Sequence, residues 1–71
     1  MPKPIALSIV LKTIQRHGFS FVRQKGSHAR FRMTGHPTRN VTIKMTKKEI
    51  PYGTFQSILI QTGLDQKDFT E

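Results

Sequence analysis

The sequence predicts an α+β fold of two layers, in which a helix, three antiparallel strands and a second helix follow one another. Apolar residues recur at helical spacing in residues 4–17 and again in residues 51–62. Between these segments, three stretches alternate apolar and polar residues, as half-buried strands do. A sheet with both helices on one face buries all of these apolar surfaces at once.

The first predicted helix covers residues 4–17. Pro4 suits the first helical position, and Gly18 can end the helix in a left-handed conformation. His17 lies in the last turn, where the helix dipole favours a partly cationic side chain, so a structural role explains it. The apolar face consists of Leu7, Val10, Leu11 and Ile14.

The three predicted strands cover residues 19–25, 28–34 and 40–45. Gly26-Ser27 between the first two is typical of a tight hairpin turn, because glycine readily adopts positive φ. A longer turn rich in glycine and proline joins the second strand to the third. His36 lies in that turn, and we interpret it as a solvated loop residue.

The segment after the third strand predicts a short turn and then the second helix. Thr46 and Glu49 have capping-box spacing, so each side chain could bond the backbone of the other. Pro51 prevents a simple continuation, and the second helix is therefore expected from Pro51 to Thr62. Asp65 and Asp68 then predict a final short turn.

The alternation of the strands also predicts which side chains face the helices. Ala29, Phe31 and Met33 share one face of their strand, because successive side chains point to opposite sides. A two-residue turn pairs Lys25 with His28, and cross-strand partners share a face. The exposed face is then expected to carry Phe21, Arg23, Lys25, His28, Arg30, Arg32, Thr42 and Lys44.

Phe21 is the residue that fits this register least well. Continuing the pairing places Phe21 opposite Arg32, which turns an aromatic side chain outward. A bulge in the first strand could return Phe21 to the core. An outward Phe21 could instead stack on a base or pack against a partner protein. The sequence leaves these alternatives open.

Length and composition bound the class of protein. We expect residues 1–71 to form a single domain, whose core must be thin at this length. The chain has no cysteine, so disulfides, thiolate metal sites and cysteine nucleophiles are excluded. The longest apolar run, "IALSIVL", is too short for a transmembrane helix, which needs about 20 residues. We expect a cytoplasmic protein that does not insert into membranes.

Charge is the strongest compositional signal. Twelve Lys and Arg residues against four Asp and Glu give a formal net charge of +8. For a small domain this favours a polyanionic partner, nucleic acid above all. The predicted exposed face contains no acidic residue, so its cations repel one another until an anion binds. His28 is the one residue of that face suited to proton transfer near neutral pH.

Two stretches of the chain resemble a known family. "GFSFVRQKGSHARFRM" resembles the centre of HicA-type toxins, the small ribonucleases of bacterial type II toxin–antitoxin pairs. "EIPYGTFQSILIQTGL" resembles their second half. The most specific parts are Gly26-Ser27-His28 followed by Phe31, and Gly53-Thr54 followed by Ile58-Leu59. Their order and spacing extend the resemblance over nearly the whole chain.

The resemblance implies a fold like that of double-stranded-RNA-binding domains, cleavage of mRNA, and neutralisation by a HicB-type antitoxin. The family's active-site histidine follows Gly-Ser, and here that residue is His28. Many members also carry Pro-x-His near the end of the third strand, where this chain has Ile43-Lys44-Met45 instead. This second histidine of the family pattern is therefore absent, which leaves the second proton-transfer group open.

The distribution of carboxylates predicts a mechanism without metal or other cofactor. All four acids lie at Glu49 or later, whereas a two-metal nuclease needs clustered carboxylates. The remaining route is attack by the RNA 2′-hydroxyl on its own phosphorus, with His28 as general acid or base. We expect RNA to be bound by Arg23, Lys25, Ser27, Arg30, Arg32 and Lys44.

Two other functions fit the same residues. A non-catalytic RNA-binding module needs the same fold and basic face, but its His28 would only contact phosphate or a 2′-hydroxyl. A protein-interaction domain would use the basic face to dock an acidic partner. RNA cleavage in the presence of EDTA separates the first alternative from the ribonuclease, and salt-dependent RNA binding argues against the second.

Overall fold

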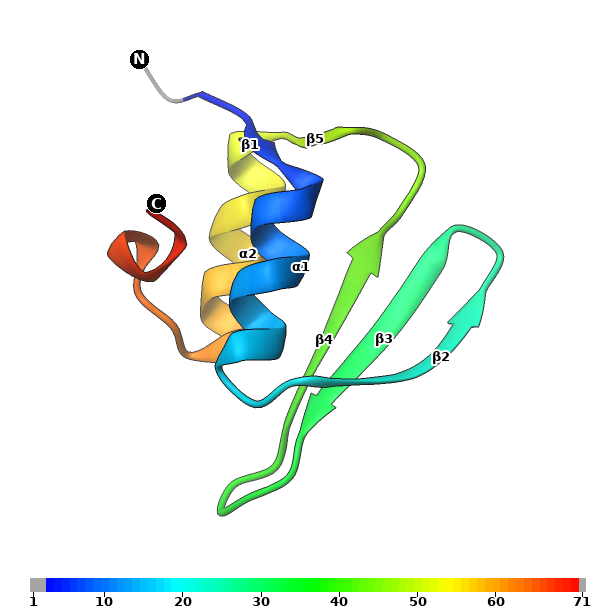
Figure 1. Ribbon diagram of the computed structural model, residues 1–71, viewed down its shortest axis with the longest axis vertical. Coiled ribbons are helices and arrows are strands. Elements are labelled where there is room, and N and C mark those ends of the chain that lie inside the picture. The colour runs from blue at the N-terminus through cyan, green and yellow to red at the C-terminus, as the bar shows by residue number, and fades with distance from the viewer. Residues whose placement is uncertain (1–2, 71) are drawn as a thin grey trace.

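The computed structural model describes residues 3–70 and contains the expected helix, three strands and helix in that order (Figure 1). Strands β2, β3 and β4 form an antiparallel sheet in the order β2-β3-β4. The α+β class is confirmed. The elements are β1 (Ile5–Ala6), α1 (Leu7–Arg16), β2 (Ser20–Lys25), β3 (His28–Met33), β4 (Arg39–Lys44), β5 (Glu49–Ile50), α2 (Tyr52–Thr62) and the 3-10 helix η1 (Gln66–Phe69).

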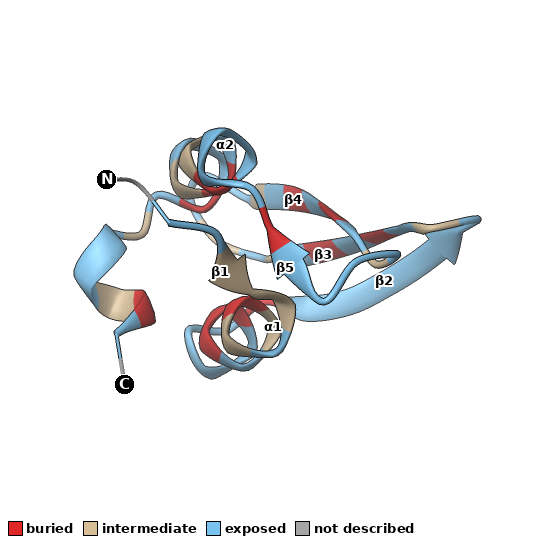
Figure 2. Cartoon of the chain, turned by 90° about the horizontal axis from the view of Figure 1, so that it is seen from above, coloured by how far each residue is buried: buried red, intermediate tan, exposed pale blue. Residues whose placement is uncertain are grey.

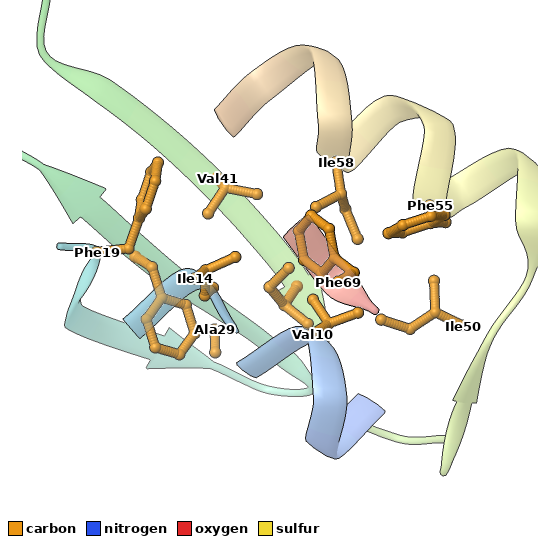
Figure 3. Close-up of a cluster of buried hydrophobic side chains, with 11 residues drawn as sticks. Val10, Ile14, Phe19, Ala29, Val41, Ile50, Phe55, Ile58 and Phe69 are labelled. Carbon is orange, nitrogen blue, oxygen red and sulfur yellow. The ribbon is translucent and has the colours of Figure 1, made fainter. Parts of the chain in front are cut away.

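Both helices lie on the same side of the sheet, which gives the expected two layers (Figure 2). The period-two pattern of β3 and β4 places their apolar residues toward the helices, where they are buried, and Met33 and Met45 at the strand ends are half-buried. This is the face that the alternation predicts. The core, drawn in Figure 3, consists of Val10, Ile14, Phe19, Ala29, Phe31, Val41, Ile43, Ile50, Phe55, Ile58 and Phe69.

The first helix begins later than its sequence pattern predicts. Helix α1 starts at Leu7 instead of Pro4, because Ile5–Ala6 pair antiparallel with Glu49–Ile50. The Leu7 N–H also donates to the Lys48 carbonyl, at 2.8 Å. The predicted capping box of Thr46 and Glu49 is wrong for the same reason, since Glu49 is part of strand β5. A distant strand here satisfies backbone groups that a helix turn would otherwise satisfy.

The hairpin register is confirmed near the turn, and farther along β2 the structure has the bulge that the sequence left open. Gly26 adopts φ +60°, and Lys25 pairs with His28 and Arg23 with Arg30. A register shift between Phe21 and Arg23 then places Phe21 opposite Phe31 instead of Arg32. The extra residue is Val22. This bulge returns Phe21 to the face of the sheet that bears the helices.

The second helix ends where its sequence predicts. Helix α2 ends at Thr62, and Gly63 adopts the left-handed conformation with φ +73°. The expected turn after it is the 3-10 helix η1, and its capping box is present. The Asp68 carboxylate accepts a hydrogen bond from the Asp65 N–H at 2.9 Å. Phe69 of η1 packs edge-on against Phe55, which attaches the C-terminal segment to the core.

Candidate functional site

The sheet face opposite the helices carries basic side chains in cross-strand rows. Because paired residues share a face, the register of both strand pairs decides which side chains are neighbours. His28 of β3 pairs with Lys25 of β2 on one side and with Lys44 of β4 on the other. Both strands therefore place a lysine beside His28, and all three residues are exposed.

Two further rows continue along the same face. Arg30 pairs with Arg23 on one side and Thr42 on the other. The next row holds Arg32 opposite Asn40, and the Arg32 Nε–H donates to the Asn40 Oδ1 at 2.9 Å. Arg32 is thus held by a neighbour, while the arginines of the middle row have no such restraint in the described part of the chain.

The first two rows enclose a shallow hollow of about 160 Å³ on the solvent side of the sheet. Its position follows from the Gly26-Ser27 turn, which fixes the register that brings the rows together. The hollow gathers positive charge around a single imidazole. It is lined by Arg23, Lys25, His28, Arg30 and Thr42.

The charge of this face is not neutralised within residues 3–70. None of Arg23, Lys25, Arg30 or Lys44 forms an ion pair with a described residue. Cations placed directly opposite one another, such as Arg23 and Arg30, repel across the strands. A bound phosphate would convert that repulsion into attraction, which makes the hollow a candidate site for an anion.

The structure brings together most, but not all, of the residues that the sequence singles out. Lys44 pairs with His28 but lines a neighbouring pocket of about 130 Å³ at the start of α2. Ser27 is half-buried in the turn, where its carbonyl accepts from the Met45 N–H at 2.7 Å. Sequence reasoning placed Thr42 on this face but did not include it among the site residues. Its signal was the same period-two alternation.

The other two histidines lie outside the hollow. His17 is at the C-terminal end of α1, and His36 is in the loop between β3 and β4. That loop and the Gly26-Ser27 turn are at opposite ends of the sheet (Figure 1). No group of three or more His, Cys, Asp or Glu side chains that could hold a metal ion occurs within residues 3–70.

The comparison with protein families decides which family this chain represents. The model of the HicA toxin of bacterial toxin–antitoxin systems matches residues 8–64. The chain belongs to the HicA toxin family. The matched range begins in α1, runs past the end of α2 and contains every residue that lines the hollow. No curated protein matches the toxin.

Membership of this family establishes the biological class. The protein is the toxin of a toxin–antitoxin pair, and its fold is compatible with that of double-stranded-RNA-binding domains. In the described part of the toxin, no helix has the length and apolar character needed to cross a membrane. The hollow around His28 is the strongest candidate for the site at which the toxin acts.

Proposed function

We propose that the toxin is a metal-independent endoribonuclease that cleaves mRNA at the hollow, with His28 as a general acid–base group. The observation that carries the proposal is the position of His28 in a hollow lined by Arg23, Lys25 and Arg30. Catalysis of phosphodiester cleavage needs a proton-transfer group next to positive charge, and this arrangement supplies both.

The proposed reaction uses the RNA's own 2′-hydroxyl as the nucleophile. A base removes the 2′-proton, the 2′-oxygen bonds to the adjacent phosphorus, and the bond from phosphorus to the 5′-oxygen breaks. An acid protonates that leaving oxygen, so the products are a 2′,3′-cyclic phosphate and a 5′-hydroxyl. His28 takes one of these proton transfers, which contributes about 10²- to 10⁴-fold in rate.

The cations around His28 have the second role. The pentacovalent phosphorane carries more negative charge than the substrate, so fixed cations stabilise it more than they stabilise the ground state. Arg23, Lys25 and Arg30 line the hollow and would contact the reacting phosphate, and Lys44 flanks His28 from the other side. No second histidine and no carboxylate lines the hollow, so we assign the other proton transfer to solvent.

The same charge suits the proposed partners. We propose that Ser27, Arg32 and the cations of the hollow bind the RNA backbone, and that a HicB-type antitoxin of acidic character neutralises the toxin. The net charge of +8 favours association with an acidic protein as well as with RNA. Cellular mRNA as substrate implies that the toxin acts in the cytoplasm.

The test compares the wild-type toxin with His28→Ala, in the presence of EDTA. We expect the wild-type protein to cleave RNA and to leave 2′,3′-cyclic or 3′-phosphate ends, and His28→Ala to lose cleavage. His17→Ala and His36→Ala are matched controls, because both histidines are exposed and lie outside the hollow. The melting temperature of His28→Ala should hardly change, since exposed substitutions alter stability by only about 0.5 kcal/mol. Its RNA affinity should also hardly change, since the Arg and Lys residues of the same face supply most of the attraction to phosphate.

Three outcomes would count against the proposal in different ways. A folded His28→Ala protein that cuts RNA at the wild-type rate removes the catalytic assignment. Activity that EDTA abolishes and magnesium restores contradicts the metal-independent route. Intact RNA after incubation with a wild-type toxin that binds it would favour the non-catalytic RNA-binding module.

A further inference from the structure

The two outer edges of the main sheet differ in how they are covered. At the β4 edge, helix α2 lies alongside, and the Gln61 Oε1 accepts a hydrogen bond from the Thr42 backbone N–H at 3.3 Å. At the β2 edge, no described element pairs with the outer side of the strand (Figure 2). All six residues of β2 are exposed. The open edge therefore presents unpaired backbone groups to solvent.

Exposed apolar side chains lie at the bulge of this same strand. Phe21 is 55% exposed and Val22 is 40% exposed. The Phe21 ring meets Phe31 edge-on with 5.7 Å between ring centroids, so the core holds one side of it and leaves the other open. An aromatic and an aliphatic side chain beside an open strand edge supply the anchors that a partner strand needs.

The charge around the edge selects the partner. Arg23 and Lys25 continue β2 beyond the bulge, and the chain has no acidic residue before Glu49. A second copy of the toxin would bring the same cations against them, so pairing between two β2 strands is disfavoured. RNA offers no backbone N–H and C=O ladder to a strand edge. The partner that satisfies backbone, apolar and charged groups together is an extended acidic protein segment.

We propose that the outer edge of β2 is the docking site for the antitoxin, which adds an extended acidic segment to the sheet beside β2. Phe21 and Val22 anchor the segment, and Arg23 and Lys25 pair with its carboxylates. The inference rests on the acidic antitoxin of the proposed function, and it does not depend on RNA cleavage. Because Arg23 and Lys25 also line the hollow, the docked segment lies at the rim of that hollow.

The test measures the affinity of the toxin for the antitoxin encoded beside it. We expect Phe21→Glu and Val22→Glu each to raise Kd at least tenfold. Each substitution removes an apolar anchor and places a negative charge against the acidic segment of the antitoxin. Ile60→Glu is the matched control: Ile60 is 79% exposed on α2, so the same change of chemistry occurs away from β2. Phe21→Glu removes the contact with Phe31 and could impair folding. Val22→Glu keeps that contact, so it tests the docking site even if Phe21→Glu does not fold.

Amide hydrogen exchange of the wild-type complex supplies a second measurement. We expect slower exchange at residues 20–25 when the antitoxin is bound. Unchanged exchange there, or equal Kd values for Val22→Glu and Ile60→Glu, would overturn the proposal. A loss of RNA binding with unchanged antitoxin binding would assign the edge to RNA and equally overturn it. Absence of RNA cleavage would contradict the proposed ribonuclease activity but not the docking site, because antitoxin binding is measured without RNA.

Discussion

Arg30 and Arg32 point to the same side of β3 but have different surroundings. Arg30 lines the hollow and has no hydrogen-bonded or charged partner among the described residues. Arg32 lies one row farther along and donates a hydrogen bond to Asn40. An unpartnered guanidinium is available for phosphate at once, whereas Arg32 must give up a bond. The two arginines should therefore contribute unequally to RNA binding.

We expect Arg30→Ala to weaken RNA binding and to lower the slope of log K against log salt concentration by about 1, as the loss of one phosphate contact does. Arg32→Ala should change both quantities less. The measurement is RNA affinity at several salt concentrations for the two variants and the wild type. Equal losses for the two substitutions would show that the Asn40 bond has no effect on phosphate binding.

The pairing of His28 with Lys25 could be predicted from the sequence because every step was local, whereas its pairing with Lys44 depends on the longer loop between β3 and β4. Gly26-Ser27 fixes a two-residue turn, and the pairing of Lys25 with His28 follows from it. Farther from the turn, the sequence left the face of Phe21 open, because one extra residue in the strand reverses the faces. The chemical role of His28 is a different matter. Sequence and geometry place it among cations, and only the RNA-cleavage experiment tests what it does.

At the scale of elements, helix α2 depends on the conformation of the residue that follows it. Gly63 has φ +73°, and a Cβ at this position would lie 2.8 Å from the guanidinium carbon of Arg39. Residues with a Cβ lose roughly 1–2 kcal/mol in this conformation. Arg39 also places its positive charge near the C-terminal end of the helix, where the dipole favours a cation.

We expect Gly63→Ala to destabilise the toxin by about 1–2 kcal/mol, mainly through the positive φ, because the end of Arg39 can move aside. For a domain of this size, each kcal/mol lowers the melting temperature by about 4–8 °C. Gly53→Ala is the control within the same helix, since nothing lies within 4 Å of its added Cβ. It should be neutral or stabilise by up to about 1 kcal/mol. Similar melting temperatures for both variants would exclude backbone strain at Gly63.

The start of α1 could not be predicted from local sequence patterns, because a distant segment of the chain decides it. Pro4 and the apolar spacing that follows it favour a helix from that residue, yet Ile5–Ala6 form a strand. Their partner, Glu49–Ile50, is more than forty residues away along the chain. Neither two-residue strand has an alternation long enough to recognise. Their pairing becomes visible only once the helices and the sheet have brought the two segments together.

At the scale of the molecule, the fold places apolar side chains on one face of the sheet and basic side chains on the opposite face. The helices cover the apolar face of β3 and β4 (Figure 2). The cations of the other face are exposed. This division could be predicted, because period-two alternation in β3 and β4 assigns each residue to one face. The uncovered edge of β2 could not, since the order of strands and the position of α2 against β4 decide it.

The position of the hollow beside that edge leads to a prediction about the neutralised toxin. An antitoxin segment along β2 would lie next to Arg23 and Lys25, and the rest of an acidic partner would be drawn over the remaining cations of the face. We therefore expect the bound antitoxin to cover His28. Reaction of the toxin with a histidine-modifying reagent, read residue by residue by mass spectrometry, measures this directly.

His17 and His36 serve as internal references in that experiment, because both are exposed in the free toxin and lie away from the hollow. In the complex, we expect modification of His28 to fall at least tenfold, while at least one of the two references keeps its rate. Full reactivity of His28 in the complex would show that neutralisation does not cover this residue. If exchange at residues 20–25 is slowed at the same time, the antitoxin docks on β2 but neutralises the toxin by holding RNA away from the cations.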